Sequence, residues 1–197
     1  MAAQSAAAAA KLFVASGCGN TSMDAIAAEA NVSKRTVCSH FESKDLLFAA
    51  VMEAICAEQG GKDGCPLGCG DDIAARPPRE MLTATALHLL TIITAEAANE
   101  LIRVIMGEAG RFPELGRTFY DSGPGWILNA VAEYLTEANK AGLLAIADPV
   151  KASRQFVALT IDPLKLELTL GIRKPPSKTE IEKLAADAAD AFLKIYG

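Results

Sequence analysis

The chain has 197 residues, of which 51% are hydrophobic, 6% are aromatic and 22% are charged, and its formal net charge is −5. This length supports one domain of ordinary size or two small ones, and the hydrophobic content is enough for a core, which excludes global disorder. The acidic balance excludes non-specific coating of nucleic acid, because such binding depends on many lysine and arginine contacts with phosphates. A small, locally basic DNA-reading surface remains compatible with it.

No uninterrupted apolar stretch reaches the roughly 18 residues expected of a membrane span. The alanine-rich start also lacks the basic front and the long apolar run of a secretory signal. We therefore expect a cytoplasmic protein with no membrane partner. Its five cysteines are then expected to be mainly reduced thiols.

Helical periodicity runs through the chain, and no strand pattern or fixed repeat competes with it. Alanine, the best helix former, dominates the first predicted helix. Serine or threonine residues that can cap a helix stand before each of the next three. The helices predicted in this first part of the chain cover residues 2–16, 21–30, 33–41 and 42–59.

The composition changes abruptly after these helices, in the segment GGKDGCPLGCGDDIAARPP, which is too rich in glycine and proline for a helix interior. We predict a first helical region over residues 1–56, a linker over 57–79 and a second helical region over 80–197. The fold is predicted to be all-α. The longer and more apolar helices of the second region are predicted at 80–94, 95–107, 114–120, 126–141, 149–170 with a break near Pro163, and 179–196.

Residues 31–44, NVSKRTVCSHFESK, combine small hydroxyl side chains and two adjacent cations with apolar anchors. Two short helices joined by a tight turn, the second carrying small polar and basic groups, are typical of a helix-turn-helix motif. Small side chains let the second helix approach phosphates and base edges in the major groove, and arginine can bind guanine with two hydrogen bonds. Val32, Val37 and Phe41 would hold that helix on its scaffold. From spacing alone, a helical corner that contacts no DNA stays an equal alternative.

The stretch from Leu12 to Val51 resembles the DNA-binding domain of the TetR family of transcriptional repressors. KLFVASG and TSMDAIAAEANVSKRTVCSHFESKDLLFAAV match in their caps, turn, hydrophobic positions and SHFxSK junction. The resemblance implies that residues 1–56 bind double-stranded operator DNA, and that 80–197 bind a small molecule and form a homodimer. The positions that it implies for DNA contact are Ser22, Ser33, Lys34, Arg35, Thr36, Cys38, Ser39, His40 and Lys44.

Two features depart from the family pattern. The family commonly has a tyrosine where this chain has Cys38, and its first helix usually begins with basic residues, where this chain has Gln4, Ser5 and alanines. In residues 1–56, four lysine and arginine side chains stand against five aspartate and glutamate side chains. We therefore expect weak, salt-sensitive DNA binding.

The segment ELIRVIMGEAGRFPELGRTFYDSGP, continuing to Phe156, resembles the C-terminal domain of AcrR-like and AefR-like members of the family. This resemblance implies a hydrophobic or aromatic effector. Pockets between helices are mostly apolar with a few polar groups, although plain core packing is the commoner role for any one such residue. The candidate lining residues are His88, Met106, Glu108, Arg111, Phe112, Phe119, Tyr120, Trp126 and Phe156.

Residues 149–170 and 179–196 are candidates for a dimer interface, because two helices from each subunit can form a four-helix bundle. Packing within one chain is the alternative. We interpret the protein as a ligand-responsive repressor that is not an enzyme and needs no cofactor. Two alternatives stay open. One is a helical enzyme using His88, Glu108 and Arg111, for which no nucleophile–base pair is evident. The other is a small-molecule-binding or redox-sensing protein with weakened DNA affinity.

Cys65 and Cys69 lie in the predicted linker, and Cys56 lies shortly before it. Thiolates are soft metal ligands, and a redox role is also open. Structural zinc usually needs four ligands at closer pair spacing. We therefore expect exposed spare thiols here and no metal.

Overall fold

A computed structural model describes residues 1–58, 65–67 and 76–197, and these residues form eleven α-helices and no strand. The all-helical prediction is confirmed. Among the described residues no single helix is long and apolar enough to cross a membrane, and only α5 and α6 together, bent by 68°, would pass that test. In chain order the helices are α1 (Ala2–Ser16), α2 (Met23–Glu29), α3 (Lys34–His40), α4 (Lys44–Glu58), α5 (Pro78–Thr94), α6 (Glu96–Glu108), α7 (Pro113–Ser122), α8 (Pro124–Lys140), α9 (Pro149–Ile161), α10 (Leu164–Thr169) and α11 (Lys178–Tyr196).

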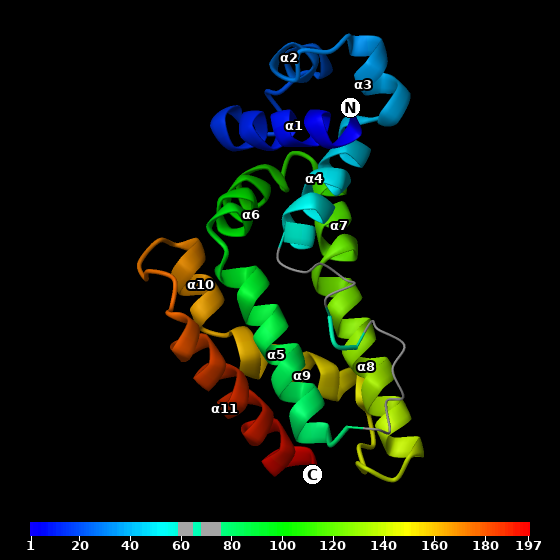
Figure 1. Ribbon diagram of the computed structural model, residues 1–197, viewed down its shortest axis with the longest axis vertical. Helices are drawn as coiled ribbons and strands as arrows, with labels where there is room; N and C mark the ends of the chain where they lie inside the picture. Colours follow the sequence, from blue (N-terminus) through cyan, green and yellow to red (C-terminus); the bar gives the residue numbers. More distant parts are fainter. Residues whose placement is uncertain (59–64, 68–75) are drawn as a thin grey trace.

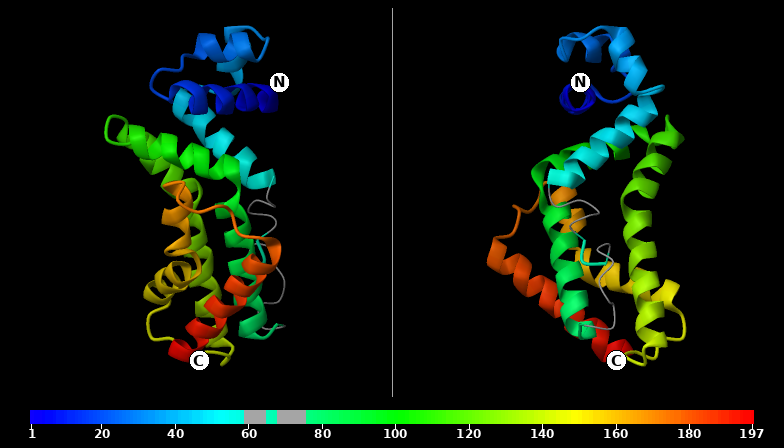
Figure 2. Two further views of the ribbon diagram at one scale, coloured as in Figure 1. Left: turned by 90° about the vertical axis from the view of Figure 1, so that its left-hand side faces the viewer. Right: turned by 45° about the vertical axis from the view of Figure 1, so that its right-hand side comes forward.

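The molecule is elongated, with α1, α2 and α3 grouped at one end (Figure 1). Helix α4 leads from this group into the second region, where it packs against α7. Helix α6 lies between the two parts and contacts α1. Helices α5, α9 and α11 pack together towards the other end, and α7 and α8 follow each other along one side (Figure 2).

Serine caps start the short helices of the first region. The hydroxyl oxygens of Ser22, Ser33 and Ser43 each accept a hydrogen bond from the backbone N–H three residues later, at 3.1, 3.0 and 3.1 Å. Each such cap contributes about 0.5–2 kcal/mol to helix stability. Asn31 forms the turn between α2 and α3 with φ 52°, a left-handed conformation that asparagine adopts more readily than most residues.

The core beneath α1–α4 extends into the second region. The rings of Phe13 and Phe48 lie 5.9 Å apart at its centre, and both side chains are fully buried. Leu101 and Ile105 of α6 and Leu115 of α7 belong to the same cluster. Side chains of α6 and α7 therefore complete the core of the first region, and packing is continuous between residues 1–56 and 80–197.

A second core lies among α5, α8, α9 and α11. Its aromatic centre is an edge-to-face contact between Phe156 and Phe192, with ring centroids 5.4 Å apart. Cys65, from the short described piece between α4 and α5, is buried in this core, so the expectation that its thiol is exposed is wrong. Because each large apolar side chain contributes about 1.5–3 kcal/mol when it is buried, this cluster holds the second region together.

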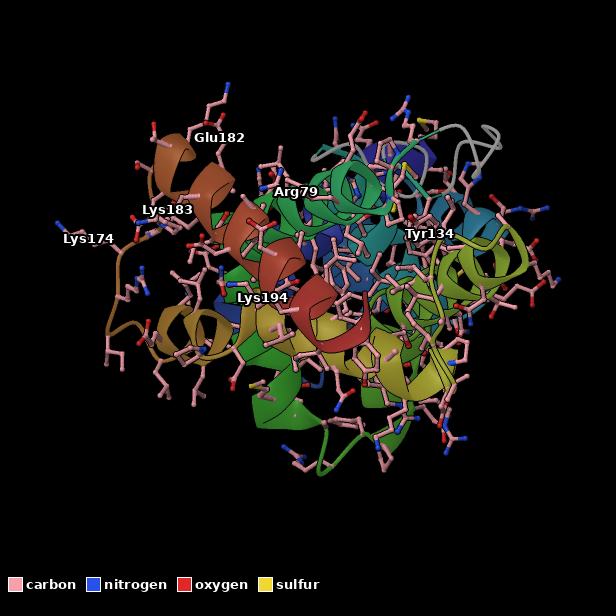
Figure 3. All side chains as sticks on the ribbon, turned by 90° about the horizontal axis from the view of Figure 1, so that it is seen from below. Arg79, Tyr134, Lys174, Glu182, Lys183 and Lys194 are labelled. Atoms are coloured by element: carbon pink, nitrogen blue, oxygen red, sulfur yellow. The ribbon has the colours of Figure 1, made fainter. Side chains whose placement is uncertain are left out.

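An ion pair with two hydrogen bonds joins the surfaces of α5 and α11. Arg79 donates from Nε to Oδ1 of Asp190 at 2.6 Å and from Nη2 to Oδ2 at 3.0 Å. Figure 3 shows Arg79 beside α11, whereas Lys174 and Lys183 point away from the bundle. The Arg79 guanidinium lowers the pKa of the Asp190 carboxyl.

Candidate nucleic-acid interface and ligand cleft

Helix α3 turns its polar residues to solvent and its apolar residue to the core. Val37 is fully buried and Phe41 nearly so, as predicted for the anchors of this helix. Lys34, Arg35 and Ser39 are exposed. A short helix with an apolar anchor on one side and small polar groups on the other is the shape that major-groove binding requires. We call the exposed side chains of α3 the reading face: Lys34, Arg35, Cys38, Ser39 and His40.

The other predicted DNA-contact residues border the reading face. Ser22 and Ser33 are exposed, and their hydroxyls cap α2 and α3. Thr36 is half-buried, with its hydroxyl 2.7 Å from that of Ser33. Ser39 donates to the backbone carbonyl of Thr36 at 2.9 Å. Local hydrogen bonds therefore hold these small side chains against the helix and leave the long cations as the protruding groups.

The two cations of the reading face differ in their partners. Lys34 Nζ lies 2.9 Å from Asp24 Oδ2, and this hydrogen bond raises the pKa of Lys34. Arg35 has no hydrogen bond or ion pair to any residue that the structure describes. Arg35 therefore has all its donors available to a ligand, whereas Lys34 must leave Asp24 first.

Lys44, the ninth predicted DNA-contact residue, holds the loop between α1 and α2. Its ammonium donates to the backbone carbonyl of Cys18 at 2.6 Å, and to those of Gly19 and Thr21 at 3.3 Å each. An ammonium has three donors, and these three acceptors account for all of them. In this structure Lys44 holds the loop between α1 and α2, and its predicted contact with DNA stays a prediction.

Three of the residues predicted to line a ligand pocket lie instead at the corner between α6 and α7. The Glu108 carboxylate accepts a hydrogen bond from the backbone N–H of Gly19. The Phe112 ring lies beneath Lys44, with Nζ 5.8 Å from the ring centroid, and the Arg111 guanidinium lies 5.4 Å from the same centroid. Cations attract the faces of aromatic rings, so these contacts join the two regions. We call Gly19, Lys44, Glu108 and Phe112 the junction.

A cleft of about 400 Å³ opens where α7, α8 and α9 meet. It brings together Tyr120 and Trp126, two of the predicted ligand-binding residues. The volume lies within the range of about 300–1,000 Å³ that is usual for small-molecule sites. Its other lining residues are Asp121, Gly125, Leu128, Asn129, Ala132, Val150, Ser153 and Arg154.

The four remaining predicted ligand-binding residues lie elsewhere. Phe156 is fully buried in the second core, and Phe119 packs against the core of the first region. Met106 is 65% exposed on α6, and His88 is half-buried on α5. The structure therefore does not bring the nine predicted residues into one pocket, and only Tyr120 and Trp126 share the cleft.

Sequence reasoning missed the polar groups of the cleft. Asn129 comes from α8, and Ser153 and Arg154 come from α9. Helical spacing alone places Asn129 and Arg154 on exposed faces of separate helices, and only the packing of α9 against α8 makes them neighbours of Trp126. No signal in the sequence could have identified them.

The cysteines and metal-binding groups do not define a site within the described ranges. No cluster of three or more His, Cys, Asp or Glu side chains is placed there to hold a metal ion. Cys38 is exposed and Cys18 is buried, and burial raises the pKa of the Cys18 thiol to about 11. The side chain of Cys56 and the whole of Cys69 lie outside the described residues.

Two family models match this chain. Residues 6–51 match bacterial regulatory proteins of the tetR family, and residues 80–197 match the C-terminal domain of AefR-like transcriptional repressors. The chain belongs to the TetR family. The resemblance noted for the helix-turn-helix and for the C-terminal region is therefore confirmed.

Solved structures of TetR-family regulators are similar over nearly the whole chain. A transcriptional regulator from Mesorhizobium loti MAFF303099 has 27% sequence identity and a TM-score of 0.79, with 100% of this chain and 96% of that chain covered. The flavonoid-responsive regulator FrrA has 34% identity and a TM-score of 0.77, with 99% and 96% covered. A regulator from Pseudomonas syringae pv. tomato str. DC3000 has 28% identity and a TM-score of 0.70, with 98% and 95% covered. No curated protein matches the sequence. These neighbours are transcriptional regulators and not enzymes.

Proposed function

We propose that this TetR-family regulator is a repressor that binds a palindromic operator as a homodimer and is released by a small aromatic effector. The observation that carries the proposal is the reading face of α3, where Arg35 has free donors and Val37 anchors the helix. Arginine can pair with guanine through two hydrogen bonds in the major groove. Lys34 would exchange Asp24 for a phosphate, and the small side chains of Ser33 and Thr36 allow close approach.

The homodimer is supported by exposed apolar side chains on the last three helices and the loop after α10. Large apolar residues gathered on a surface usually mark a protein–protein contact. A two-fold interface built from these helices would place two reading faces one DNA turn apart. The exposed apolar residues are Val150, Leu159, Leu166, Leu170, Ile172 and Ile195.

The effector site that we propose is the cleft of Tyr120 and Trp126. Two aromatic side chains beside Asn129 and Arg154 suit a planar aromatic molecule that carries hydroxyl or carbonyl groups. The relative FrrA, 34% identical, is flavonoid-responsive. We therefore propose a polyphenolic effector of that general class.

Helix α7 is the proposed connection between the cleft and the reading face. It carries Tyr120 near its C-terminal end and begins directly after Phe112 of the junction. A ligand that moves α7 would pull on the Lys44–Phe112 and Glu108–Gly19 contacts, and so change how α1–α3 sit on α6. To shift occupancy strongly, the effector must prefer the released conformation by a few kcal/mol.

The test is fluorescence anisotropy with DNA fragments selected from a random operator pool by the full chain. We expect salt-dependent binding to a palindrome, which Arg35→Ala weakens by about 1–3 kcal/mol with relaxed specificity. Lys174→Ala, an exposed lysine far along the chain from the reading face, is the matched control and should bind like the wild type. Flavonoids should release DNA from the wild type and fail to release it from Trp126→Ala. If selection at low salt yields no specific site, the repressor proposal is wrong.

A second candidate function is a small-molecule-binding protein whose DNA affinity is weak. Two contacts favour it: Lys34 is paired with Asp24, and Lys44 donates to backbone carbonyls. Both cations would have to give up these contacts before they could bind DNA phosphates. This candidate is supported if calorimetry shows that the protein binds an aromatic ligand and the operator selection finds no specific DNA site.

A further inference from the structure

Two cations lie together where α10 packs against α6, outside the reading face, the junction and the cleft. Lys165 belongs to the first turn of α10, and Arg103 belongs to α6. The two helices contact each other, and Figure 1 shows α10 just below α6. Arg103 is exposed and stands four residues after Asn99 on α6, so the two side chains lie on the same face of that helix. Asn99 contacts Lys165, which places Arg103 beside it. None of the functions proposed above uses this pair.

A fixed amide holds the lysine. Lys165 Nζ donates to Oδ1 of Asn99 at 2.9 Å. Asn99 is only 5% exposed, and its Nδ2 donates to the backbone carbonyls of Ile93 at 2.8 Å and Ala95 at 3.0 Å. These two bonds set the orientation of the amide, so that its oxygen faces the ammonium. The Lys165 side chain is thus directed to a defined place in a half-buried position.

No carboxylate of the described residues forms an ion pair with either cation. Neither Lys165 nor Arg103 forms an ion pair within the ranges that the structure describes, and the nearest acid along α10, Glu167, is paired with Arg173 at 2.9 Å. Burial and the charge of Arg103 lower the pKa of Lys165 to about 8. An ammonium has three donors and a guanidinium has five, so most of these donors have no acceptor among the described residues.

We propose that Lys165, Arg103 and Asn99 form a binding site for a small oxyanion, a carboxylate or a phosphate group. The ammonium supplies a positive charge held by Asn99, and the guanidinium supplies a planar fork that fits either group with two hydrogen bonds. A bound oxyanion would accept hydrogen bonds from both side chains, and its negative charge would offset the repulsion between the two cations.

A carboxylate of a second copy of the chain is the competing occupant. Leu166, on the same helix as Lys165, and Leu170, directly after that helix, are exposed and belong to the proposed dimer face. The half-buried position of the ammonium favours a small anion that can enter beside Asn99, over a side chain presented by a neighbouring surface. The experiment therefore has to separate these two occupants.

The test uses the full chain in chloride buffer at constant ionic strength, titrated separately with acetate and with inorganic phosphate. We expect the melting temperature to rise with saturable dependence on at least one of the two anions. The Lys165 side-chain carbon resonance, assigned by its loss in Lys165→Met, should report a higher lysine pKa when the anion is bound. Saturation by acetate alone assigns a carboxylate ligand, and saturation by phosphate alone assigns a phosphate ligand.

Variants identify the site. Lys165→Met and Arg103→Ala should each weaken anion binding about tenfold or more, because each removes charge-assisted hydrogen bonds. Lys174→Met, which removes an exposed lysine that Figure 3 shows pointing away from the bundle, should leave binding unchanged. Lys165→Met replaces a half-buried cation by an apolar side chain of similar length, so the fold should be retained.

Three results would overturn the proposal. One is the absence of saturable stabilisation by either anion. Another is equal stabilisation of the wild type and Lys165→Met, which would indicate a general salt effect. The third is dissociation of the dimer by Lys165→Met in sedimentation, with no effect of added anions on the wild type, which would assign the cations to the subunit interface. None of these measurements involves DNA, so their outcome is independent of the proposed repressor function.

Discussion

The Glu108 carboxylate, at the end of α6, accepts a hydrogen bond from the backbone N–H of Gly19, a residue 89 positions earlier in the chain. The carbonyl of the same glycine accepts from Lys44 at 3.3 Å. The loop between α1 and α2 is therefore held through both of its polar groups at Gly19, once from α4 and once from α6. This contact joins α6 directly to the unit that carries the reading face.

Glu108→Ala should loosen the junction. The Gly19 N–H would lose its acceptor, and an unsatisfied, partly buried amide costs about 1–3 kcal/mol. We expect a lower free energy of unfolding in urea and faster hydrogen exchange at the Gly19 amide. Glu114→Ala, which removes an exposed glutamate of α7, is the control and should leave both measurements unchanged. Unaltered exchange at Gly19 in Glu108→Ala would show that the carboxylate does not protect this amide.

Gly19→Ala should destabilise the protein by crowding the junction. An added Cβ would lie 2.6 Å from the Phe112 ring and 3.1 Å from the Glu108 carboxylate. Such overpacking typically costs about 1–3 kcal/mol. Gly110→Ala, where a Cβ meets nothing within 4 Å, is the matched control. In the double variant with Phe112→Ala the cost should be less than the sum of the two single costs, and strict additivity in thermal unfolding would contradict the contact.

Tyr134→Phe should stabilise the unliganded protein. The Tyr134 hydroxyl is buried in the second core and has no hydrogen-bond partner in the described part of the chain. Its burial raises the pKa of the phenol to about 12. Removing a buried polar atom that makes no hydrogen bond should raise the free energy of unfolding by about 1 kcal/mol. Tyr120→Phe, at an exposed tyrosine, should change stability little, and a destabilised Tyr134→Phe would reveal a partner for this hydroxyl.

Lys165 should make stability rise with pH in alkaline solution. Its pKa is lowered from an ordinary value of 10.5 to about 8 in the folded protein, by burial and by Arg103. Between these values the unfolded chain binds more protons than the folded one, so the free energy of unfolding increases with pH. Below about pH 8 both states hold the proton and this contribution does not vary.

The measurement is the difference between the pH profiles of the wild type and Lys165→Met. The subtraction is needed because Cys18, whose pKa rises from 9.0 to about 11, acts in the opposite direction from pH 9 upward. A thiol that stays protonated only in the folded state makes stability fall as pH increases. Parallel profiles for the two proteins between pH 8 and 10 would contradict the perturbed lysine.

Asp24→Asn should strengthen DNA binding if the chain is a repressor. Lys34 would lose its partner at 2.9 Å and become available to a phosphate. We expect the plot of log affinity against log salt to steepen by about one unit, as for one added phosphate contact. Asp45→Asn, at an exposed acid of α4 that forms no ion pair with Lys34 in the described part of the chain, controls for the change in net charge. Identical salt dependence in Asp24→Asn and the wild type would place Lys34 outside the DNA interface.

Local signals in the sequence were sufficient for the helices and for the reading face. Ser33 caps α3 and Val37 is buried beneath it, as predicted, because caps and apolar spacing act within a few residues of the same helix. The resemblance to the TetR family, which the two family models confirm, was also visible in residue types and their spacing along the chain. These features depend on neighbours in the chain, which a sequence displays directly.

Contacts between helices were decided by the tertiary structure alone. Glu108 and Phe112 look like pocket residues in the sequence but lie at the junction, whereas Tyr120 and Trp126 share a cleft with Arg154 of another helix. The physical reason is that the partner of an exposed or half-buried side chain depends on how each helix is rotated and crossed over its neighbours. That arrangement is set by the packing of both cores as a whole, and no segment of the sequence carries it by itself.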